Sequence, residues 1–112
     1  MNLSKRVSNK QLREIFIHLN KKYFNGALPI PGVLKFVDLE DEGDEGICTS
    51  DEILISKSLQ DHPDYAWLTL LHEMVHWKLR AYGRDYGDDS HGYNFKREIF
   101  RLWDLGAYEG LL

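Results

Sequence analysis

The chain has 112 residues, enough for one domain with a single core, and its 43% hydrophobic and 12% aromatic residues are typical of a folded globule. No apolar run approaches the roughly 18 residues of a membrane helix, and the polar first ten residues do not resemble a secretion signal, so we expect a cytoplasmic protein with no membrane association. The one cysteine, Cys48, excludes an internal disulfide framework and a multi-cysteine zinc ribbon.

The formal net charge of −4 comes mainly from one short segment. Its six acids are Asp38, Glu40, Asp41, Glu42, Asp44 and Glu45. Without these six, the chain has 14 Lys and Arg residues and 12 acidic residues, a net charge of +2. The segment lacks the ligand spacing of an EF-hand, so we interpret it as a solvated loop rather than a Ca²⁺ site. An acidic chain of this kind predicts weak or no DNA binding.

The first half of the chain predicts a helix followed by short strands. Apolar residues at helical spacing indicate a helix over residues 9–25, with Ser8 or Asn9 as its N-cap and Asn25-Gly26 as its stop. Runs of β-forming residues predict strands at residues 33–38, 46–49 and 53–56.

The second half predicts two helices separated by a polar loop. The first runs from about residue 63 to 82 and the second from about 91 to 104, where Asp89 or Ser90 is the expected cap. The expected core stripe of the first is Leu68, Leu71, Val75 and Leu79. That of the second is Phe95, Ile99 and Leu102, widened by Phe100 and Trp103.

The helix over residues 63–82 contains the sequence HEMVH. His72 and His76 are four residues apart, which places both imidazoles on one helix face, one turn apart. Both can reach one Zn²⁺ at about 2.0–2.1 Å, and Glu73 can address a water on the metal. This is the HExxH arrangement of zinc hydrolases. The alternative interpretation is an amphipathic core helix with two histidines on its polar face.

A catalytic zinc has three protein ligands and an open position for water, so a third ligand must come from elsewhere. His91 is a candidate because it follows a loop and opens the last helix, from where it can fold back onto HEMVH. Glu98 is the alternative, since other zinc hydrolases take a carboxylate from the following helix. We interpret His18 and His62 as surface or core residues, and Cys48 as a small buried hydrophobe rather than a thiolate ligand.

Five segments resemble, in order, the SprT-like zinc metallopeptidase domain, which is also the protease core of Spartan. They are YFNGALP (23–29), GIC (46–48), ILISKSL (53–59), LLHEMVH (70–76) and HGYNFK (91–96). The resemblance spans about residues 12–103. It implies that His72, His76 and His91 are the zinc ligands and that Glu73 is the general base, and so favours His91 over Glu98. It also implies a zincin-like fold, a small sheet packed on helices with the metal cleft beneath an edge strand.

The chain departs from many SprT-like proteins because it has no four-cysteine zinc ribbon, so the family's link to DNA–protein crosslinks is not carried over. We expect a single α+β domain over residues 1–112, with a core at about 9–105, a three-stranded sheet and about three helices. The predicted activity is that of a metalloprotease, a hydrolase that cleaves peptide bonds through a zinc-activated water with Glu73 as base.

The alternative function is a zinc-stabilised binding module with little or no catalytic activity. We expect a monomer that acts on a protein or peptide substrate. Tyr82, Tyr86 and Tyr93 are candidates for stabilising the oxyanion, and the sequence does not rank them.

Overall fold

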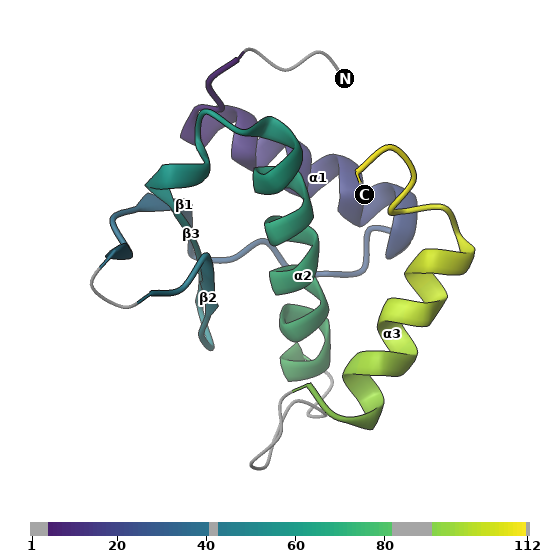
Figure 1. Ribbon diagram of the computed structural model, residues 1–112. Helices are drawn as coiled ribbons and strands as arrows, with labels where there is room; N and C mark the ends of the chain where they lie inside the picture. Colours follow the sequence, from purple (N-terminus) through teal and green to yellow (C-terminus); the bar gives the residue numbers. More distant parts are fainter. Residues whose placement is uncertain (1–4, 41–42, 82–90, 112) are drawn as a thin grey trace.

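Three helices and a small mixed sheet form the part of the chain that the computed structural model describes, residues 5–40, 43–81 and 91–111 (Figure 1). The helices are α1 (Asn9–Tyr23), α2 (Pro63–Ala81) and α3 (Tyr93–Asp104), and the strands are β1 (Val33–Val37), β2 (Gly46–Cys48) and β3 (Glu52–Ser56). The expected α+β class is confirmed. All bounds lie within two residues of the predicted ones, apart from residue 82, which falls outside the described ranges.

The sheet has the order β1-β3-β2, so β2 is an edge strand. β3 runs parallel to β1, where Val33 is opposite Glu52, and antiparallel to β2, where Gly46 is opposite Ile55. Ile53 and Ile55 of β3 are fully buried and point to the helices, as the two-residue period of a strand requires. In Figure 1 the sheet lies on one side of α2 and α3 lies on the other.

Helix α1 begins and ends where its sequence signals predict. Ser8 is the N-cap and forms a capping box with Gln11, in which each side chain accepts a hydrogen bond from the other residue's backbone N–H, at 3.1 and 3.0 Å. Asn9, the other candidate cap, instead accepts a hydrogen bond from the Phe36 N–H of β1. After the helix, Asn25 and Gly26 adopt positive φ angles of 55° and 70°, which turns the chain away.

Helix α2 is the central element, because the sheet, α1 and α3 all pack against it. Leu71, Val75 and Leu79 are buried as predicted. Leu68 is only half-buried and lines a surface cleft, so its assignment to the core stripe was wrong. In the described part of the chain, no helix is both long and apolar enough to cross a membrane.

Helix α3 packs on α2 with a narrower face than the sequence predicts. Phe95 and Leu102 are buried, but Phe100 and Trp103 are 66% and 59% exposed, so the prediction that they widen the core face was wrong. The buried carboxylate of Glu98 occupies the inner face between them, and positions 100 and 103 turn outward. The cap position is Gly92, while the expected caps Asp89 and Ser90 lie outside the described residues.

Candidate metal centre

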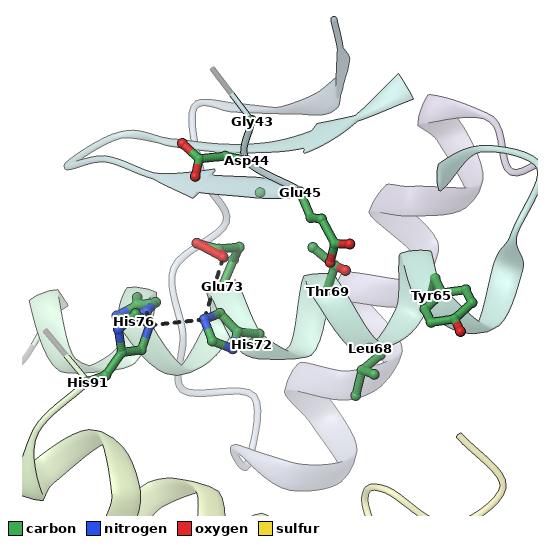
Figure 2. Close-up of a pocket in the computed structure, with 11 residues that line it drawn as sticks. Gly43, Asp44, Glu45, Tyr65, Leu68, Thr69, His72, Glu73, His76 and His91 are labelled. Atoms are coloured by element: carbon green, nitrogen blue, oxygen red, sulfur yellow. Dashed lines mark hydrogen bonds and ion pairs between the residues drawn. The ribbon is translucent and has the colours of Figure 1, made fainter. Parts of the chain in front are cut away.

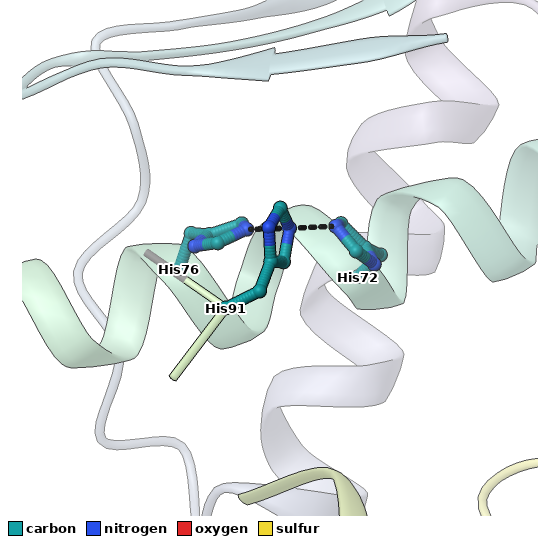
Figure 3. Close-up of side chains that lie close together, drawn as sticks. All are labelled: His72, His76 and His91. Atoms are coloured by element: carbon teal, nitrogen blue, oxygen red, sulfur yellow. Dashed lines mark hydrogen bonds between the residues drawn. The ribbon is translucent and has the colours of Figure 1, made fainter. Parts of the chain in front are cut away.

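Two helices bring three histidines together. His72 and His76 project from one face of α2, one turn apart, and His91 lies two residues before the start of α3 (Figure 3). His76 is buried, His72 is half-buried and His91 is exposed. The ligand nitrogens of all three lie within 4.8 Å of one another, and they form the one such group of potential metal-ligating side chains among the described residues.

Two of the nitrogen–nitrogen distances match those of a tetrahedral metal site. The Nε2 atom of His91 is 3.2 Å from Nε2 of His76 and 3.3 Å from Nε2 of His72. Two ligands at about 2.05 Å from one ion, at a tetrahedral angle, would have their nitrogens about 3.3 Å apart. The three histidines therefore lie close enough to hold a metal ion, and this distance alone does not identify the metal.

Phe95 supports all three imidazoles from behind. It lies in the first turn of α3, is 8% exposed, and its ring centroid is 5.0 Å from that of His72, 4.7 Å from His76 and 4.8 Å from His91. The ring stacks on His76 at an interplanar angle of 29°. The predicted place of Phe95 in the core is confirmed, and its ring in addition contacts the three histidines of the site.

The packing of the histidines keeps His72 neutral. Burial is the main cause that lowers the pKa of His72 to about 4, and the neighbouring His76 and His91 contribute to the same shift. A neutral imidazole has a nitrogen lone pair available to a metal, whereas an imidazolium does not.

Glu73 lies beside the histidines and beneath the edge strand. Its side chain is buried, and its Oε2 atom is 4.0 Å from Nε2 of His72 (Figure 2). Gly46 of β2 passes directly above it: a Cβ at that position would lie 3.0 Å from Cγ and 3.1 Å from Oε2 of Glu73. A side chain at position 46 would thus displace either β2 or the Glu73 carboxylate.

A cleft of about 480 Å³ lies between β2 and α2 and contains Glu73 and the three histidines. Its other walls include Asp44 and Glu45 before β2, and Tyr65, Leu68 and Thr69 from the first turns of α2 (Figure 2). The sequence patterns did not predict a role in the site for these three α2 residues. The helical period could have found them, because positions 65, 68, 69, 72 and 76 share one helix face.

Tyr65, which lines the cleft, is not among the three tyrosines that the sequence suggested for stabilising an oxyanion. Tyr82 and Tyr86 lie outside the described residues. Tyr93 is 73% exposed and is not among the cleft's lining residues. Tyr65 does line the cleft.

Glu98, the alternative third ligand, is in an ion triad instead of the histidine group. It is 7% exposed, and it accepts hydrogen bonds from Nζ of Lys78 on α2 at 2.9 Å and from Nε of Arg101 at 2.7 Å. Burial by itself raises the pKa of Glu98, but the bonds and charges of Arg101 and Lys78 outweigh burial and lower it. The carboxylate therefore serves to join α3 to α2.

The remaining candidates lie elsewhere. Half-buried His18 packs edge-on against Trp67, and His62 is exposed next to Tyr65. Cys48 is half-buried on β2 and packs against the core. Of the acidic segment, Asp44 and Glu45 are exposed, and residues 41–42 lie outside the described ranges.

No family model matches the chain, and no curated protein matches it either. The resemblance to SprT-like metallopeptidases consequently depends on the sequence motifs alone and stays a prediction.

Proposed function

We propose that the protein is a zinc-dependent peptidase of the SprT-like, zincin kind, in which His72, His76 and His91 hold the metal and Glu73 is the general base. The observation that carries the proposal is the convergence of the three Nε2 atoms in a cleft where the Glu73 carboxylate is 4.0 Å from one of them. A purely structural site has no need of a carboxylate in that place.

Zinc is the proposed metal because three imidazoles are a ligand set that it accepts in catalytic sites, with a fourth position left open. Bound there, zinc would supply Lewis acidity, which lowers the pKa of water from 15.7 to about 7 and polarises a carbonyl. The chain's own residues supply the remaining functions.

Glu73 handles the proton in this proposal. Its carboxylate accepts a proton from the attacking water and delivers it to the leaving amine. Gly46 and Thr69 limit the space around the carboxylate, because a Cβ on residue 46 would lie 3.0 Å from Cγ2 of Thr69 and 3.1 Å from Oε2 of Glu73. Water thus reaches Glu73 from the cleft.

The edge of β2 offers a place for an extended substrate. β2 pairs with β3 on one side, and its other edge is the outer edge of the sheet, next to the cleft. A peptide in extended conformation can form backbone hydrogen bonds along such an edge. Its scissile bond would then lie between β2 and the HEMVH face of α2.

A binding module stabilised by zinc is the second candidate. It is favoured by the origin of the ligands, since a metal held by α2 and by His91 joins two helices and would stabilise the fold. Cleavage distinguishes the two functions.

The test is the change Glu73→Gln, with Glu45→Gln as a matched control on the exposed rim of the same cleft. The amide retains the size of the carboxylate but does not accept the water's proton, so peptide cleavage should fall by about 10²–10⁴-fold while zinc content and melting temperature stay nearly constant. The Glu45 variant should retain most of its activity. Absence of cleavage by zinc-loaded wild type on unfolded proteins would favour the binding module. Chelator-insensitive cleavage, equal in wild type and the Glu73 variant, would indicate a contaminant.

A further inference from the structure

The outer face of α3 carries an unusual group of exposed aromatic rings. Among the described residues, seven large hydrophobic side chains are exposed, and three of them are Tyr93 (73%), Phe100 (66%) and Trp103 (59%) on this helix. Leu105, directly after the helix, is a fourth at 53%. Scattered single hydrophobes are normal on a surface, but Phe100 and Trp103 lie one turn apart, and neighbouring exposed aromatic rings are typical of interaction sites.

These residues share one side of the helix with a set of charges. At about 100° per residue, positions 93, 100 and 103 lie on the side opposite buried Phe95, Glu98 and Leu102. Exposed Lys96, Arg97 and Asp104 lie on the same outer side. In Figure 1, α2 is next to the inner side of α3, and the outer side faces away from the other described helices and the sheet. Trp103 also contacts the ring of Tyr108 in the segment after the helix, with ring centroids 5.9 Å apart.

The charges on this face are arranged so that the face is complementary to itself. Its cations, Lys96 and Arg97, lie toward the N-terminal half, and its acid, Asp104, is the last residue of the helix. The dipole of α3 disfavours a negative charge at that end. A second α3 running antiparallel would bring its positive N-terminal half and its two cations next to Asp104.

We propose that a second copy of this chain covers the outer face of α3, in a symmetric antiparallel pair of α3 helices with the twofold axis near Phe100. In this pairing the two Phe100 rings meet at the axis. Position 97 of one copy is opposite positions 103 and 104 of the other, so Arg97 meets both the ring of Trp103 and the carboxylate of Asp104. The dimer does not depend on the proposed enzyme activity.

The size of the face predicts a weak dimer. An aromatic side chain buries about 150–250 Å² in full, so three that are roughly two-thirds exposed offer about 400 Å² per copy. The pair would bury about 800 Å² from these rings, and more from the flanking charged side chains, which is the range of weak and transient complexes. We therefore expect association that depends on concentration at micromolar levels.

Other occupants fit the face less well. An anionic membrane would attract Lys96 and Arg97, but it would repel Asp104 and the net charge of −4. A uniformly acidic protein partner would also leave Asp104 facing like charge. A copy of the same helix is complementary to both ends of the face.

Sedimentation equilibrium from low micromolar to sub-millimolar concentration tests the proposal. Wild type should show a monomer–dimer equilibrium, and Phe100→Glu, which places two carboxylates together at the axis, should weaken dimerisation at least about tenfold. Ile17→Glu is the matched control, because Ile17 is 48% exposed on α1, away from this face. A thermal melt of each variant checks that it folds. We expect both variants to fold, because Phe100 and Ile17 are exposed.

Charge reversal tests the antiparallel geometry. Arg97→Glu and Asp104→Arg should each weaken the dimer, and the double variant should recover it. Failure of the double variant to recover contradicts the pairing. Wild type that is monomeric at every concentration, or a dimer unaffected by Phe100→Glu, overturns the proposal. So does a monomer that co-sediments with phosphatidylserine vesicles through Trp103, since the occupant is then a membrane.

Discussion

Replacing the buried carboxylate of Glu98 by an amide should destabilise the fold without removing the metal. In the variant Glu98→Gln, two cations lose the negative charge that they contact: Lys78, across the α2–α3 interface, and Arg101, one turn along α3. Both cations also lie near the ring of Phe24, with Nζ of Lys78 at 5.8 Å and Cζ of Arg101 at 5.3 Å from its centroid. The amide leaves two positive charges close together in partly desolvated surroundings.

The magnitude follows from the burial of the three partners. Removing one member of a fully buried ion pair costs about 3–5 kcal/mol. Here the Glu98 side chain is 9% exposed, but those of Lys78 and Arg101 are 24% and 37% exposed, so solvent screens part of the loss. We expect the free energy of unfolding to fall by about 2–3 kcal/mol, which for a chain of this length lowers Tm by about 10 °C.

Urea and thermal unfolding of metal-loaded protein measure this change. Glu14→Gln is the control, because Glu14 is exposed on α1 and its change should stay within about 0.5 kcal/mol. If Glu98→Gln unfolds within that same margin of wild type, the triad does not stabilise the fold as described. Loss of zinc from the folded variant would instead mean that Glu98 is a ligand.

The same residue predicts an acid-sensitive component of stability. The pKa of Glu98 is lower in the folded protein than its ordinary value of 4.5, so the folded state binds the proton less tightly than the unfolded state. The stabilisation is present above that ordinary value and is lost as the pH falls through the lowered folded pKa. Unfolding free energy measured from neutral to acidic pH should fall less in Glu98→Gln than in wild type.

Four further predictions concern the site and its surroundings. His91→Ala should weaken zinc binding by orders of magnitude, measured by chelator competition, whereas Glu98→Ala should retain one zinc per chain. Phe95→Ala should cost about 3–5 kcal/mol of unfolding free energy and loosen the metal, because it removes the ring that contacts all three histidines, while Phe95→Leu should retain more of both. Gly46→Val should reduce cleavage much more than zinc content, because the new side chain meets Glu73 and Thr69. DNA binding, measured by anisotropy at physiological salt, should be weak or absent.

Specific outcomes would contradict each of these. The ligand assignment is wrong if Glu98→Ala strips the metal and His91→Ala retains it. Normal zinc affinity in folded Phe95→Ala would mean that its ring does not orient the imidazoles. Full activity of Gly46→Val would show that β2 does not need to approach Glu73 closely. Micromolar DNA binding with a steep salt dependence would reveal a basic surface that the net charge conceals.

Local sequence signals predicted the elements well because each signal acts within a few residues. Ser8 caps α1 through its own neighbour Gln11, and Asn25-Gly26 turns the chain through its own φ angles. His72 and His76 are placed on one face by helix geometry alone. These features require no knowledge of how the helices pack.

Features that depend on packing were not fixed by the sequence pattern. Spacing left His91 and Glu98 open as third ligands, because it does not state where α3 lies relative to α2. In the structure Lys78 of α2 binds the carboxylate of Glu98, which lies outside the histidine group. Periodicity likewise identified the apolar positions Leu68 and Phe100 without saying which helix side meets a neighbour, and one lines the cleft while the other faces outward.

The connection between β1 and β2 forms part of the cleft wall, and the sheet does not depend on its length. β1 and β2 are joined by the eight residues 38–45, and both strands are held independently by β3. The conformational entropy of closing such a connection grows only with the logarithm of its length, so doubling it costs about 0.6 kcal/mol. Asp44 and Glu45 at its end form part of the cleft wall. The connection can therefore be lengthened or changed in sequence with little loss of folding stability. For the proposed peptidase, the connection between β1 and β2 is therefore the place where selectivity for a peptide substrate can be altered while the helices and the histidines remain as they are.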